Sequence, residues 1–174
     1  SDRIFLPSKA HYHLNSLKEQ GFIQKKSTRL RMNKSGIFLD LYFEKEINPK
    51  ISDKTIGIDI GIKKLLTTSE GLIYGKEIES LLYKIGRKKQ GSNAFKRALI
   101  ERNEYINRSI KEMLQDTKAN VIVLEDIKNL NKGKKSYKSV KMNKNKRWVY
   151  SKLLKELKMK AEVVGVQCLN EQTL

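Results

Sequence analysis

The chain has 174 residues, enough for one main hydrophobic core with a small appendage and too few for two complete enzymatic domains. Its 37 Lys and Arg residues against 19 Asp and Glu residues give a formal net charge of +18, which favours a polyanionic partner, nucleic acid above all. The sequence has no apolar run of about 18 residues that would span a membrane, and its single cysteine, Cys168, excludes an internal disulfide.

The first part of the chain, residues 1–50, is expected to form a separate β region. A short strand and a helix are expected first, and the alternating residues 28–46 then predict a β-hairpin that turns at the polar sequence NKSG. Pro49 and its polar neighbours favour a linker. We therefore place a domain boundary near residue 50, with a second domain over residues 51–174.

The second domain begins with a predicted antiparallel meander of three strands. These strands are expected at residues 56–60, 64–69 and 72–78. A long helix is expected over residues 92–118, because its apolar residues recur at helical spacing and Ser92 or Asn93 can cap its start.

Two strands and one further helix complete the predicted order. VIVLED, residues 121–126, opens with four apolar residues and predicts a strand that is buried on both faces. A helix is expected over residues 148–161 and a last strand in VVGVQC, residues 163–168. The order β-β-β-α-β-α-β is typical of an α/β layered sheet.

Asp59 is an isolated carboxylate within the first strand of this domain. The two-residue period of a strand places it on one face with Gly57 and Gly61, opposite a face of isoleucines. Glycine weakens a strand, so we interpret the pair as marking close approach by a ligand or by another backbone. The alternative is a carboxylate that caps a turn, with Gly61 serving only a bulge.

A second carboxylate, Glu125 or Asp126, can meet Asp59. A right-handed crossover can return VIVLE beside the first strand, although parity alone leaves Asp126 as a competitor. Two neighbouring carboxylates without clustered His or Cys favour Mg²⁺ or Mn²⁺ as a compensating cation. Two such ions would support phosphodiester cleavage by a two-metal mechanism, with Asp59 and one of these two acids as metal ligands.

Lysines provide the candidate contacts to nucleic acid. Residues 128–147 hold many lysines and no acid, and are predicted to form a mobile loop. The alternative is a solvated, lysine-rich surface that touches nothing. The candidates for phosphate contact are Lys63, Lys64, Lys132, Lys134, Lys135, Lys138 and Lys141, with Lys96, Arg97 and Arg108 as weaker ones. No role is assigned to His11 or His13.

Four segments together carry a resemblance: GIDIGIKKLLTTSEG, ERNEYINRSIKEML, ANVIVLEDIKNLN and RWVYSKLLKELKMKAEVVGV. They strongly resemble the RuvC-like nuclease domain of TnpB, the OrfB-type protein of insertion sequences, which is related to type V CRISPR effectors. The resemblance covers about residues 55–174. It implies an RNase H-like fold, in which a mixed five-stranded sheet with flanking helices follows a β-hairpin similar to the end of a wedge, or OB-like, barrel.

The resemblance also implies an activity, metal-dependent cleavage of a DNA target directed by a guide RNA. Asp59 matches the aspartate of the first RuvC motif and Glu125 the glutamate of the second, with Mg²⁺ or Mn²⁺ as the expected cofactor. The family continues with a four-cysteine zinc ribbon and a third-motif aspartate, which this chain lacks. We therefore expect this chain to be a fragment that binds no Zn²⁺ and cleaves DNA poorly by itself. The protein is expected to be soluble, cytoplasmic and nucleoid-associated, of prokaryotic type, with no membrane partner.

Two rival functions remain open. Actin-like and sugar-kinase-like ATP-binding domains also begin with a GIDxG-type hairpin, but Ile62, Lys63 and Lys64 here replace the small residues that usually follow. A non-catalytic domain that binds nucleic acid is the other rival, and it predicts salt-sensitive binding without metal-dependent cleavage.

Overall fold

The computed structural model describes the backbone of residues 12–125 and 139–170, and the side chains of residues 12–125 and 150–170. The chain divides into two compact units, residues 1–46 and residues 47–174. Residues 47–50 belong to the second unit, where the Lys50 N–H donates a hydrogen bond of 2.9 Å to the Gly165 carbonyl.

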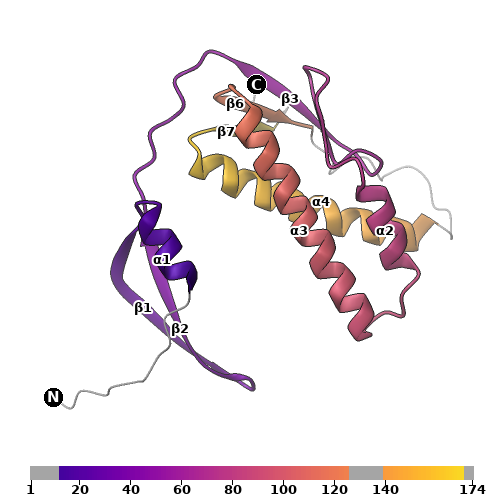
Figure 1. Cartoon of the computed structure of the whole chain (residues 1–174), viewed down its shortest axis with the longest axis horizontal. Coiled ribbons are helices and arrows are strands. Elements are labelled where there is room, and N and C mark those ends of the chain that lie inside the picture. Colours follow the sequence, from indigo (N-terminus) through magenta and orange to yellow (C-terminus); the bar gives the residue numbers. More distant parts are fainter. Residues whose placement is uncertain (1–11, 126–138, 171–174) are drawn as a thin grey trace. The chain divides into compact units, whose positions relative to one another are not determined.

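The first unit contains a helix and the predicted β-hairpin. Helix α1 (Tyr12–Glu19) precedes the antiparallel strands β1 (Ile23–Asn33) and β2 (Gly36–Glu44), seen in indigo and violet in Figure 1. The Asn33 side chain accepts a hydrogen bond of 2.8 Å from the Ser35 N–H, which fixes the tight turn between the strands. The hairpin predicted over residues 28–46 is confirmed, and its first strand begins earlier, at Ile23.

The second unit is built on a five-stranded mixed sheet, which confirms the predicted α/β class. Its strand order is β5-β4-β3-β6-β7, antiparallel among the first three and parallel among the last three. The strands are β3 (Thr55–Ile60), β4 (Leu66–Thr68), β5 (Ile73–Tyr74), β6 (Val121–Leu124) and β7 (Gln167–Asn170). The central strand β3 therefore joins the meander to the parallel half.

Three helices accompany the sheet: α2 (Ile78–Gly86), α3 (Asn93–Asp116) and α4 (Ser139–Val163). Ser92, one of the two predicted candidates, is the N-cap of α3, and its Oγ accepts a hydrogen bond of 3.1 Å from the Phe95 N–H. Helix α4 begins well before the predicted residue 148 and continues to Val163. The last strand consequently starts later than predicted, at Gln167, after a turn at Gly165.

The third strand and the helix after it correct the sequence prediction. The strand predicted over residues 72–78 ends at Tyr74, because Gly75 adopts a φ of 71° that leaves the extended conformation. Helix α2 follows, and it buries Ile78 and Ile85, two turns apart on one face. The sequence analysis missed this helix.

The core lies on one face of the sheet, where α3 and α4 pack against each other (Figure 1). In β3, Ile56, Ile58 and Ile60 are at most 4% exposed. In β6, the alternate residues Ile122 and Leu124 are fully buried, whereas Val121 and Val123 are only half-buried. The expectation that β6 is buried on both faces is therefore wrong.

The crossover rule explains this one-sided core. The connections from β3 to β6 and from β6 to β7 advance in the same direction across the sheet. Parallel crossovers are right-handed, so the helices of both connections lie on the same face. Among the described residues, the opposite face of the sheet remains partly exposed. No helix in the described part of the chain is both long and apolar enough to cross a membrane.

Candidate carboxylate site

Asp59 and Glu125 lie next to each other on the partly exposed face of the sheet. In the parallel pairing of β3 with β6, Gly57 is opposite Val123 and Ile58 is opposite Leu124. The next residue on each strand is a carboxylate, and both carboxylates are exposed. Neighbouring strands are about 4.8 Å apart, so the structure brings together the two acids that the sequence analysis paired.

The two glycines beside Asp59 differ in whether the structure requires a glycine there. A Cβ on Gly61 would lie 2.7 Å from the Lys64 carbonyl oxygen, so the return of the β3–β4 turn requires a glycine there. A Cβ on Gly57 would meet only the Ser69 Cβ, at an ordinary 3.8 Å. At Gly61, the close approach inferred from the sequence is thus made by the Lys64 backbone. At Gly57, a side chain would be sterically tolerated, so this glycine only leaves open space near Asp59.

The phenol of Tyr150 on α4 is affected by the charges of both carboxylates. Burial, together with the negative charges of Asp59 and Glu125, raises the pKa of the Tyr150 phenol above its usual value. Tyr150 lies within the helix expected over residues 148–161, and its partly buried ring packs against the core. The proximity of Tyr150 to the two carboxylates could not be predicted from the sequence, because the spacing of residues within a helix does not reveal which strand ends the helix faces.

Both carboxylates are accessible to a ligand, because both residues are exposed. Within residues 12–125 and 150–170, neither Asp59 nor Glu125 takes part in an ion pair or a hydrogen bond. No group of three His, Cys, Asp or Glu side chains that could hold a metal occurs in that part of the chain. Two hard oxygen donors side by side fit a divalent cation such as Mg²⁺ or Mn²⁺ that keeps most of its water ligands.

The candidate lysines are only partly located. Lys63 and Lys64 are exposed in the turn that directly follows β3, close in sequence to Asp59. The weaker candidates Lys96, Arg97 and Arg108 are exposed on α3. The remaining five candidates lie outside the residues whose side chains the structure describes, and Asp126 lies there too. These are Lys132, Lys134, Lys135, Lys138 and Lys141.

Cys168 lies apart from the carboxylates, on β7 opposite Ile122. Burial raises the pKa of its thiol to about 11, with a smaller opposing effect from the positive charge of Lys158. A thiol in this state is a poor metal ligand and a poor nucleophile at neutral pH.

No protein-family model matches the chain, and no curated protein is similar enough to count as a match.

Proposed function

We propose that the second unit is a RuvC-like nuclease domain, and that the parent protein is a TnpB-like, RNA-guided DNA endonuclease. The juxtaposition of Asp59 and Glu125 on one sheet face is the observation that carries this proposal. The sheet order, with an antiparallel meander continued by two parallel strands, is compatible with the RNase H-like fold that the resemblance implies.

The two carboxylates hold Mg²⁺ or Mn²⁺ in this proposal. Such an ion polarises a phosphoryl oxygen and makes a bound water a better nucleophile. Asp59 and Glu125 orient the ion at the exposed face, where a polymer can reach it. Because the described residues contribute only these two acids, cation binding is weak and cleavage by this chain alone is slow or absent.

The charge of the chain supports a nucleic-acid substrate. A formal charge of +18 attracts phosphate backbones, and the exposed Lys63 and Lys64 stand just beyond the strand that carries Asp59. A guide RNA and a DNA target are the partners that this function requires.

A scaffold that binds nucleic acid without cutting it is the second candidate. The exposure of both carboxylates favours it over an ATP-binding domain, as does the lack of a third acid grouped with them among the described residues. In an ATP-binding hairpin the turn after Asp59 would cradle phosphate with small residues, whereas here Lys63 and Lys64 occupy it.

Mn²⁺ binding tests the proposal most directly. The experiment follows free Mn²⁺ by electron paramagnetic resonance during titration of the chain, with Asp59→Asn, Glu125→Gln and the control Asp53→Asn. Asp53 is also exposed, and it precedes β3 at the opposite end of that strand. We expect at least a tenfold loss of affinity in the first two variants and none in the control, since each ligand lost typically costs more than about 1.4 kcal/mol.

Cleavage of plasmid and single-stranded DNA with Mg²⁺ is the accompanying measurement. Any cutting should disappear in Asp59→Asn, because the nuclease needs that carboxylate. Unchanged Mn²⁺ affinity in both carboxylate variants would rule out the cation site. Salt-sensitive DNA binding would then identify the second candidate.

A further inference from the structure

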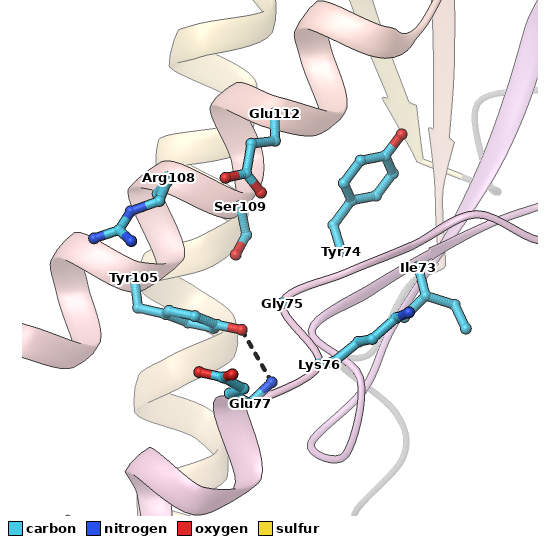
Figure 2. Close-up of a pocket in the computed structure, with 9 residues that line it drawn as sticks. All are labelled: Ile73, Tyr74, Gly75, Lys76, Glu77, Tyr105, Arg108, Ser109 and Glu112. Atoms are coloured by element: carbon cyan, nitrogen blue, oxygen red, sulfur yellow. Dashed lines mark hydrogen bonds between the residues drawn. The ribbon is translucent and has the colours of Figure 1, made fainter.

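A second polar site lies on the helical side of the sheet, between the end of β5 and helix α3. It is a pocket of about 360 Å³ lined on one side by residues around Gly75 and on the other by one face of α3 (Figure 2). This volume is within the range of about 300–1,000 Å³ that is typical of sites for small molecules. The pocket is distinct from the carboxylate pair, since it lies at the edge strand and not on β3 or β6.

Ser109 is the unusual residue of this pocket. Its side chain is only 2% exposed, yet the described part of the chain gives its hydroxyl no hydrogen-bond partner. A Cβ on Gly75 would lie 3.0 Å from the Ser109 Oγ, so the absence of a side chain at residue 75 leaves this hydroxyl open to the pocket. A ligand in the pocket can therefore form the hydrogen bond to this hydroxyl that no described residue supplies.

Glu112 lies one helical turn after Ser109, and Figure 2 shows its carboxylate on the same side of α3 as the Ser109 hydroxyl. Below them, the Tyr105 hydroxyl accepts a hydrogen bond of 2.9 Å from the Glu77 N–H, which leaves its own proton free to donate. The pocket therefore combines two carboxylates, Glu77 near Tyr105 and Glu112 near Ser109 (Figure 2), which only accept hydrogen bonds, with the hydroxyl groups of Ser109 and Tyr105, which can donate.

Aromatic rings and cations complete the site. The rings of Tyr74 and Tyr105 lie to either side of Gly75 in Figure 2, and Tyr74 is held by a hydrogen bond of 3.1 Å from its hydroxyl to Asp116. Lys76 and Arg108 line the same pocket and are exposed, and neither forms an ion pair with any residue that the structure describes. Aromatic rings with nearby cations are the usual elements of a site for a nucleotide base and its phosphate.

We propose that this pocket binds a guanine base, with the Glu112 carboxylate as its specificity-determining group. Guanine presents two adjacent donors, N1–H and the 2-amino group, that match the two oxygens of a carboxylate, and its O6 can accept from the Ser109 hydroxyl. Adenine presents one donor and one acceptor on that edge, and cytosine one donor. A basic peptide would also suit Glu112, but a chain of charge +18 repels it.

The base belongs either to a nucleic-acid strand or to a free nucleotide, and competition separates these sources. The probe is a short fluorescent oligothymidine with one central guanosine, compared with the same strand carrying inosine, which lacks the 2-amino group, or thymidine only. Fluorescence anisotropy in EDTA measures affinity for the whole chain. Free guanosine monophosphate is then added as competitor.

We expect the guanosine strand to bind about tenfold more tightly than the inosine or thymidine strands, as for one good bidentate contact to a base. Glu112→Gln should abolish this preference, and Ser109→Ala should reduce it. Glu104→Gln, another exposed glutamate of α3 outside the pocket, should keep it. Competition by guanosine monophosphate alone at similar concentration would assign the pocket to a free nucleotide, and weak competition to a strand.

Equal affinity for the three strands together with no binding of guanosine monophosphate would overturn the inference, as would a guanosine preference that survives Glu112→Gln. Asp59→Asn should leave the preference intact, because the pocket needs no divalent cation. The result is therefore independent of the Mn²⁺ experiment on the carboxylate pair.

Discussion

Asp59 and Glu125 directly follow Ile58 and Leu124, two residues that are paired across neighbouring parallel strands. Because the two acids share one cation in the proposed site, their contributions to binding should not add. We expect Asp59→Asn combined with Glu125→Gln to lose an amount of Mn²⁺ affinity that differs from the sum of the two single losses. Calorimetric titration measures the three affinities, and a double variant whose loss equals the sum of the single losses would show two independent sites.

Cys168 should react slowly with thiol reagents in the folded chain. Its pKa rises from 9.0 to about 11, so the reactive thiolate is about 10- to 100-fold scarcer at pH 8 than in the unfolded chain. Labelling with Ellman's reagent, with and without urea, checks this expectation. Equal rates in both conditions would contradict the burial of the thiol.

The same shift makes stability depend on alkaline pH. Because the folded pKa of Cys168 is the higher one, its contribution to stability is present below pH 9 and is lost as the pH rises toward about 11. Urea unfolding as a function of pH should show this decrease in the native chain. In Cys168→Ala the decrease over this pH range should be smaller.

Gly165, in the turn between α4 and β7, should not tolerate a side chain. Its φ is 75°, and a Cβ there would lie 2.5 Å from the Asn48 carbonyl oxygen, a backbone atom that cannot move alone. Gly165→Ala should therefore lower the free energy of unfolding by about 2–4 kcal/mol, as strained backbone and overpacking together predict. Gly71→Ala is the matched control, since Gly71 has a φ of 84° and nothing within 4 Å of its Cβ position.

The control should lose only about 1 kcal/mol, the cost of a left-handed conformation in a residue other than glycine. Urea denaturation of the two variants checks the difference. Equal losses of stability in Gly165→Ala and Gly71→Ala would show that the left-handed backbone conformation outweighs the contact with the Asn48 carbonyl oxygen.

Arg102 should be replaceable by an apolar side chain. It is 4% exposed, and its guanidinium bonds only to the Asn103 side chain, with no carboxylate partner among the described residues. Burial accordingly lowers the pKa of Arg102. Arg102→Met retains the packing of the aliphatic stem and removes the cost of the buried charge, so we expect stability to be unchanged or to rise by about 1 kcal/mol. A loss of more than about 2 kcal/mol in urea unfolding would contradict this account.

The sequence alone determined the features that depend on short-range patterns. The NKSG turn, the Ser92 cap and the alternation around Asp59 each involve residues within a few positions of one another, and the structure contains all three. The handedness of crossovers predicted that VIVLED returns beside the strand of Asp59, but it left Glu125 and Asp126 as alternatives, and only the family resemblance favoured Glu125. Helix α2 was missed because the β-branched and aromatic residues before it extended the apparent strand past Gly75.

Only the tertiary structure decided what depends on contacts between distant segments. The placement of α3 and α4 on one face of the sheet left Val121 and Val123 half-buried, which a run of apolar letters cannot reveal. The proximity of Tyr150 to the carboxylates likewise depends on how a helix crosses a sheet. The pocket at Ser109 exists because β5 ends just before Gly75, beside α3. These features could not be predicted because packing between distant segments, unlike local propensity, leaves no pattern in the spacing of residues.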